Sequence, residues 1–172
     1  MPRITALTSE QASPVALKLL QSAKAKIGMV PNLFSTLAHA PAALAGYLQL
    51  DENLKTGALS AAQREIISLA IGQFNQCGYC LSAHTLMGKG AGLSPDAIAA
   101  ARLGSGSAVA ELAVQVAQTR GNVSDADLSA ARAAGLSDEQ IIEVVASVAL
   151  NVLTNYVNNL AETVIDFPKV SV

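Results

Sequence analysis

The two cysteines of the chain, Cys77 and Cys80, lie three residues apart, and His84 follows four residues after the second. Two thiols at this spacing can close a disulfide when one turn of backbone brings their Cβ atoms to about 3.8 Å. On a helix that begins near Gly78, His84 lies one turn beyond Cys80 on the same face. These side chains are the parts of a thiol redox site with a base beside one thiol.

The chemistry of the pair depends on how easily a thiolate forms. A helix N-terminus and a nearby imidazolium both lower the pKa of a thiol. A thiolate beside a second thiol can be oxidised to a sulfenic acid and then resolved as a disulfide. Two other interpretations are inert apolar packing and a zinc site completed by His84 and Glu65. We favour redox chemistry over inert packing because C-x-x-C spacing by chance is uncommon with only two cysteines in 172 residues, and over zinc because a second C-x-x-C motif is absent.

A carboxylate, Glu65, interrupts the apolar helical pattern that precedes the thiols. Acids are common in the first turns of helices because they complement the helix dipole. With Ala62 before it and Leu69 after it, Glu65 lies at the border of an apolar stripe, where a carboxylate needs a partner. We expect that partner to be His84. The other histidine, His39, has no such neighbour, and we interpret it as structural.

Composition narrows the protein class. The chain has 172 residues, 51% of them hydrophobic, 3% aromatic and 14% charged, with a formal net charge of −2. This length predicts one domain that can bury a sizeable core. No basic run is present, so we expect no nucleic-acid partner. The high apolar content exceeds what one small domain can hide, which predicts a homo-oligomer.

The N-terminus lacks the apolar segment of a signal peptide, and the most apolar run, residues 144–150, is too short to span a bilayer. We therefore expect a soluble, cytoplasmic protein with no membrane partner. Thiols are kept reduced in that compartment, where a C-x-x-C motif is more often catalytic or metal-binding than structural.

Apolar residues recur at helical spacing along the chain, and no stretch alternates with the period of a strand. The pattern predicts a single all-α domain over residues 1–172, a bundle of about eight helices with an extended arm at 1–9. Ser60 with Gln63 and Ser137 with Gln140 are predicted capping boxes. The expected helices are roughly 10–28, a short one from Pro31, 41–56, one from Ala61 that ends near Gly78, 78–90, 95–103, 108–119, 125–135 and 138–165.

Two segments of the sequence are similar to each other. Residues 59–70 and 136–147 each begin with Leu-Ser, place a glutamine three residues after the serine and continue as an apolar helix. An asparagine-containing segment follows each of them. We interpret this as a possible internal duplication in which only the first copy holds thiols.

Glu65, eleven further residues, C-x-x-C, three residues and His84 together resemble the signature of the alkylhydroperoxidase D (AhpD) family. That family belongs to the carboxymuconolactone decarboxylase-like superfamily. Asn75, two residues before Cys77, also fits the signature. The segment GMVPNLF at 28–34 resembles the peroxidase-related branch, and the resemblance is strongest over residues 28–93.

The resemblance implies an AhpD-like all-α fold assembled into trimers or hexamers. It implies reduction of a hydroperoxide substrate, with electrons from a dithiol or protein thiol and no cofactor or metal. By position, Cys80 corresponds to the thiol that attacks the peroxide and Cys77 to the resolving thiol. Glu65 and His84 correspond to the proton relay.

Tyr79 departs from the best-known branch, which has a histidine immediately before the second cysteine. A phenol can donate a hydrogen bond but is a poor base near neutral pH, so we expect a shorter relay and a weaker or redirected activity. Tyr79 and Asn75 are candidate supporting residues. Two alternatives remain: a non-catalytic redox-sensing or zinc-binding module, and a cofactor-free decarboxylase-like lyase. The lyase branch lacks the cysteine pair, so the thiols favour the peroxidase.

Overall fold

In the computed structural model all 172 residues are described, and they form nine α-helices and no strand. The predicted all-α class is confirmed. The total is nine, not about eight, and each of the nine segments expected along the chain, including the short one after Pro31, is present as a helix. The helices are α1 (Pro14–Ile27), α2 (Asn32–Leu37), α3 (Pro41–Leu54), α4 (Ala61–Phe74), α5 (Gly78–Gly90), α6 (Pro95–Arg102), α7 (Ala108–Thr119), α8 (Asp125–Ala133) and α9 (Asp138–Ala161).

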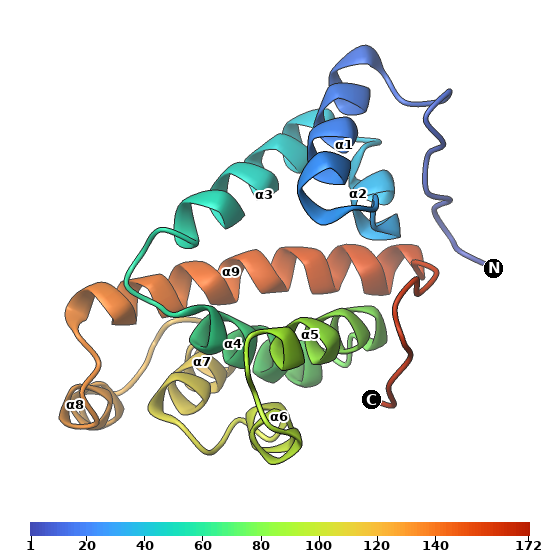
Figure 1. Cartoon of the computed structure of the whole chain (residues 1–172). Coiled ribbons are helices and arrows are strands. Elements are labelled where there is room, and N and C mark those ends of the chain that lie inside the picture. The colour runs from blue at the N-terminus through green and yellow to red at the C-terminus, as the bar shows by residue number, and fades with distance from the viewer.

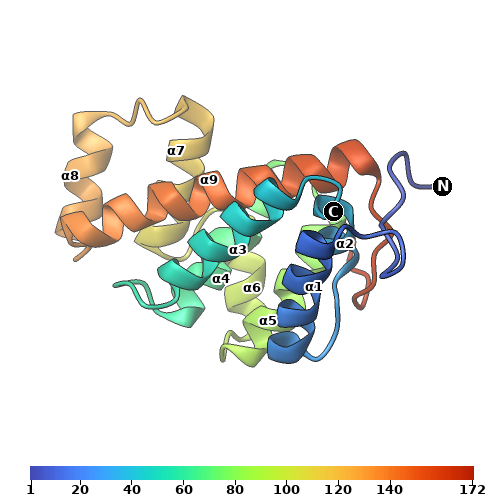
Figure 2. The same ribbon diagram turned by 90° about the horizontal axis from the view of Figure 1, so that it is seen from above.

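The longest helix, α9, crosses the whole molecule (Figure 1), with α1 to α3 on one side of it and α4 to α7 on the other. The view from above shows α3 running alongside α9 (Figure 2). On the opposite side, α4 packs against α5, α6, α7 and α9, which confirms the central position predicted for it.

Both predicted capping boxes are present. The Ser60 and Ser137 hydroxyls accept the backbone N–H of Gln63 and Gln140, and each glutamine side chain accepts the backbone N–H of its serine. Each box satisfies two N–H groups that a helix start leaves without partners. The α9 side chain Glu143 also accepts backbone N–H groups just before α4, so the starts of α4 and α9 are tied together.

Several predicted helix ends are wrong by a few residues. The first helix begins at Pro14, not near Glu10, because Ser13 is the N-cap. The last helix ends at Ala161, not near residue 165, because Glu162 takes a left-handed backbone conformation with φ 50°. Left-handed conformations end a helix because the next carbonyls can no longer stay in register.

Residues 1–9 contain no helix and lie against the bundle. The backbone N–H groups of Arg3 and Ile4 donate to the carbonyl of Ala161, and the N–H of Leu7 donates to Ser35. His39 contributes to the same attachment, since its Nε2 lies 2.9 Å from the carbonyl oxygen of Thr5.

By length and composition alone, α9 is long and apolar enough to cross a membrane, which the run at 144–150 is not. It packs against α2, α3, α4, α5 and α7, however, and it buries the polar residues Asn151, Asn155 and Asn158. These contacts make α9 a core helix of the bundle.

Candidate redox site

The turn between α4 and α5 positions the two thiols. Asn75 is the C-cap of α4, and Gln76 takes a left-handed conformation with φ 51°. The chain therefore leaves α4 after Phe74, earlier than the predicted break at Gly78. Cys77 then becomes the N-cap of α5, where its Sγ accepts the backbone N–H of Cys80 at 3.2 Å.

Cys77 and Cys80 are joined by a disulfide, with their Cα atoms 5.3 Å apart. The residues differ in accessibility: Cys77 is 0% exposed, whereas Cys80 is 3% exposed and lines a cavity. Only Cys80 can meet a small molecule in that cavity without a change of backbone.

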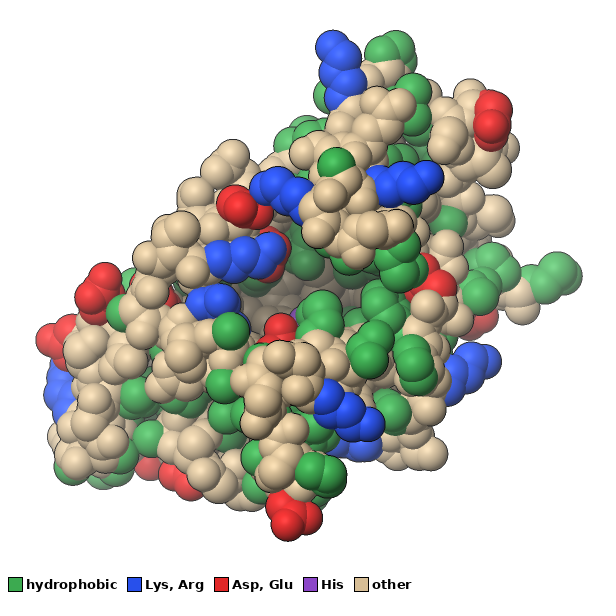
Figure 3. Space-filling view, in the orientation of Figure 1, with side chains coloured by type: hydrophobic (Ala, Val, Ile, Leu, Met, Phe, Trp, Pro, Cys, Tyr) green, Lys and Arg blue, Asp and Glu red, His purple; other side chains and the backbone are tan.

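The cavity has a volume of about 460 Å³, within the range of small-molecule binding sites. It lies between α3 on one side and α4, α5 and α9 on the other, and it opens as a hollow in the face seen in Figure 3, with basic and apolar side chains at its edge. Its apolar walls include Leu33, Phe34, Leu54, Met87 and Leu150.

Glu65 and His84 form a pair in the wall of this cavity. The Oε2 atom of Glu65 lies 2.8 Å from Nδ1 of His84, and both side chains are mostly buried. The expected partnership of these residues is confirmed. It arises because α4 packs along α5. When Nδ1–H donates to Glu65, Nε2 of His84 is left free for proton exchange.

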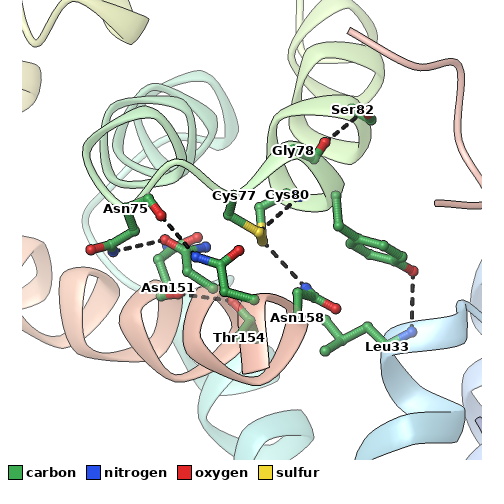
Figure 4. The surroundings of a disulfide bond; sticks show 12 residues. Leu33, Asn75, Cys77, Gly78, Cys80, Ser82, Asn151, Thr154 and Asn158 are labelled. Carbon is green, nitrogen blue, oxygen red and sulfur yellow. Dashed lines mark hydrogen bonds between the residues drawn. A yellow bond between two sulfur atoms is a disulfide. The ribbon is translucent and has the colours of Figure 1, made fainter. Parts of the chain in front are cut away.

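Asn158 is a site residue that the motif did not identify. Its Nδ2 atom donates to Sγ of Cys80 at 3.3 Å, and its side chain is buried on α9 (Figure 4). Its Oδ1 atom has no hydrogen-bond partner. The sequence feature that could have identified Asn158 is a run of asparagines in an otherwise apolar helix, since buried amides need hydrogen-bond partners.

Asn75, a predicted supporting residue, contacts α9 and not a thiol. Its Nδ2 donates to Oδ1 of Asn155 at 2.9 Å, and its carbonyl accepts Nδ2 of Asn159 at 2.8 Å (Figure 4). These bonds fix the end of α4 against α9, so Asn75 positions the turn that carries the cysteines.

Tyr79, the second predicted supporting residue, lines the cavity, but its hydroxyl is engaged elsewhere. It accepts the backbone N–H of Leu33 at 3.2 Å, and its ring meets that of Phe167 edge-on at 5.6 Å. Burial raises the pKa of Tyr79 above its ordinary value, although the bond from Leu33 opposes the shift. The phenol therefore stays protonated and joins α5 to α2.

The residues considered as zinc ligands are not gathered into one group in this structure. The chain contains no group of three or more His, Cys, Asp or Glu side chains that could hold a metal ion. Cys77 lies outside the cavity that Cys80 lines, and His84 is bonded to Glu65.

Comparison with known proteins supports the family and the fold. Residues 41–117 match the sequence model of the carboxymuconolactone decarboxylase family. A peroxidase-related protein from Ralstonia eutropha, described as an alkylhydroperoxidase AhpD core, is similar over 96% of this chain and 92% of its own, with a TM-score of 0.84 and 24% identity. A peroxidase-related protein from a Silicibacter species is similar over 94% and 91%, with a TM-score of 0.76 and 21% identity.

The same fold also occurs in the debrominase Bmp8. A cysteine-to-alanine variant of that enzyme, in complex with 2,3,4-tribromopyrrole, is similar over 95% of this chain and 91% of its own, with a TM-score of 0.74 and 17% identity. Among curated proteins nothing matches the chain. The resemblance drawn from the motif is thus confirmed for the fold, and the family model matches its central part, residues 41–117.

Proposed function

Since residues 41–117 match the carboxymuconolactone decarboxylase family and the whole chain has the AhpD-like fold, we propose that this protein is a thiol-dependent hydroperoxide reductase. One observation carries the proposal. A disulfide-forming cysteine and a carboxylate–histidine pair face the same cavity, and that cavity is large enough for an organic hydroperoxide.

In the first step the Cys80 thiolate attacks the terminal oxygen of the hydroperoxide. An S–O bond forms and the O–O bond breaks, so the sulfur is oxidised by two electrons and the peroxide is reduced. The products are a sulfenic acid on Cys80 and an alcohol. His84, one turn after Cys80, supplies the proton that the leaving oxygen needs, and Glu65 holds the imidazole in one tautomer.

In the second step the Cys77 thiolate attacks the sulfenic sulfur of Cys80. The disulfide forms and the oxygen leaves as water after gaining a proton. A dithiol or a protein thiol then reduces the disulfide by thiol–disulfide exchange and returns both thiols to the protein.

The assignment of roles rests on two different properties of the thiols. The cavity gives Cys80 access to the peroxide. Cys77 is the N-cap of α5, and this position stabilises a thiolate on Cys77, because the backbone N–H of Cys80 and the helix dipole both favour negative charge there. A readily ionised thiol suits the resolving step, in which Cys77 must attack.

The remaining expectations complete the proposal. A reducing cytoplasm would keep the cycle supplied with thiol donors. A trimer or hexamer would cover the exposed apolar side chains of α9, among them Ile142 and Leu160.

The experiment that tests the function follows peroxide consumption by the reduced protein with a dithiol donor, using an alkyl hydroperoxide. We expect sustained consumption that Cys80→Ser abolishes. Consumption that persists in Cys80→Ser would contradict the proposal, and so would debromination of tribromopyrrole by a protein that leaves hydroperoxides untouched.

A further inference from the structure

Tyr47 contributes to the cavity wall from a helix other than those that carry the thiol and the proton relay. It belongs to α3 and lines the same cavity as Cys80 and His84. Its ring packs against Phe34 of α2, with ring centroids 5.6 Å apart and an interplanar angle of 60°. This contact limits the rotation of the ring, so the hydroxyl has a defined position.

The hydroxyl of Tyr47 makes no hydrogen bond within the chain and is not among the fully buried polar atoms, so it is open to the cavity. The Ser147 hydroxyl in the same wall also lacks a partner but is fully buried, whereas other hydroxyls near the thiol are paired. Thr154 donates to the carbonyl of Asn151, and Ser68 donates to that of Arg64. Tyr79 is bonded to the backbone of α2. A polar group inside a protein usually has a partner, so the free phenol of Tyr47 points to a partner that enters the cavity.

Tyr47 keeps its proton. Burial raises the pKa of Tyr47 above its ordinary value, and the carboxylates of Asp51 and Glu65 raise it further. Glu65 and His84 line the same cavity as Tyr47. Tyr47 is therefore a neutral hydrogen-bond donor in the cavity of the proton relay.

We propose that Tyr47 is a catalytic residue that donates a hydrogen bond to the leaving oxygen of the hydroperoxide. The inference rests on the proposed function. As the Cys80 thiolate attacks the terminal oxygen, negative charge develops on the other oxygen while the O–O bond breaks. Tyr47 stabilises that charge, and His84 delivers the proton that completes the alcohol. The phenol keeps its own proton throughout.

A fixed donor aimed at developing charge is usually worth about 10²- to 10³-fold in rate. Its value depends on how basic the leaving oxygen is. An alkoxide leaving group needs the donor strongly, whereas the carboxylate released from a peroxy acid needs it little. A packing role for the phenol would not discriminate between these two substrates.

The test compares wild type, Tyr47→Phe and Tyr156→Phe. The control residue, Tyr156, lies on α9, is exposed and is absent from the cavity wall. The rate of Cys80 oxidation is measured on the reduced proteins with tert-butyl hydroperoxide and with a peroxybenzoic acid. We expect Tyr47→Phe to lose about 10²-fold with tert-butyl hydroperoxide and far less with the peroxy acid. Tyr156→Phe should match wild type with both.

The ratio of the two rates is taken within each variant, so a partly unfolded sample does not change it. The thiolate titration of Cys80 should also be unchanged in Tyr47→Phe. Equal losses with both oxidants, or no loss with either, would overturn the role of Tyr47 and leave the proposed function intact. A wild-type protein that reacts with neither oxidant would overturn both.

Discussion

The helices α4 and α9 start alike and then diverge. Each begins with a serine capping box and an apolar first half. After 14 residues α4 ends, because Gln76 takes a left-handed conformation, and the next helix starts on a cysteine. In contrast, α9 continues without a break for 24 residues and buries Asn151, Asn155 and Asn158 in its second half.

The two similar segments therefore have different roles: α4 ends at the turn that carries the thiols, and α9 holds that turn in place. The break after α4 creates a helix start, and with it the N–H groups and dipole that stabilise a thiolate. The unbroken α9 supplies a rigid wall whose amides hold that break in place, through Asn155 and Asn159 to Asn75 and through Asn158 to Cys80.

The strongest test on the α4 side removes the charge of Glu65. Glu65→Gln keeps the shape of the side chain, but the imidazolium of His84 becomes harder to form and the Cys80 thiolate loses its counter-charge. We expect the peroxide rate to fall by roughly 10²-fold and the Cys80 pKa to rise. The thiolate is measured by its ultraviolet absorbance against pH.

His84→Ala should be as damaging as Glu65→Gln, and the double variant little worse, because residues that act as one unit are non-additive. Fully additive losses, or an unchanged thiolate titration in Glu65→Gln, would mean that Glu65 only complements its helix dipole.

The matching test on the α9 side is Asn158→Leu. A hydrogen bond to a charged group is worth about 1.5–3 kcal/mol, so its loss should raise the Cys80 pKa by roughly one to two units. The peroxide rate near neutral pH should fall accordingly. The control is Asn159→Leu, which removes a bond to the carbonyl of Asn75 but none to sulfur. If both variants shift the Cys80 pKa equally, Asn158 acts only through the packing of the turn.

A smaller effect on chemistry is expected on the outer face of α9. Ile142 is 68% exposed and Leu160 is 59% exposed, and burying such residues between subunits would stabilise an oligomer. Light scattering should show a trimer or larger, and the double variant Ile142→Glu with Leu160→Glu should dissociate it. Activity per chain should change little, because neither Ile142 nor Leu160 lines the cavity. A monomeric wild-type protein at micromolar concentration would contradict the homo-oligomer that the high apolar content predicts.

The smallest effect concerns alkaline pH and Tyr79, next to the break. The ordinary tyrosine pKa is 10.0, and burial raises the pKa of Tyr79 in the folded state. Above pH 10.0 the unfolded chain therefore loses the proton first, so stability should be full below this pH and fall as the pH rises beyond it. Urea unfolding on either side of this pH measures the loss. Tyr79→Phe should lower stability at every pH but flatten the alkaline fall, and an equally steep fall would assign it to other groups.

The sequence predicted those parts of the site that depend on local spacing. The serine caps, the one-turn offset of His84 from Cys80 and the need of Glu65 for a partner all follow from helical geometry. The contact between Asn158 and Cys80 joins residues 78 positions apart, so it depends on how α9 packs. The place of Tyr47 in the cavity wall likewise follows from the position of α3. The end of α4 was mispredicted because a glutamine, not Gly78, adopts the left-handed conformation.

The central claim is that Cys80 and Cys77 complete a peroxide-driven disulfide cycle with these roles. Mass spectrometry of the reduced protein after one equivalent of alkyl hydroperoxide tests it most directly. We predict a loss of two hydrogens, located to a Cys77–Cys80 disulfide and reversed by a dithiol, while Cys77→Ser should hold Cys80 as sulfenic or more highly oxidised acid. An unchanged mass in wild type would contradict the cycle. Oxidation held on Cys77 in Cys80→Ser, with Cys80 unmodified in Cys77→Ser, would reverse the roles.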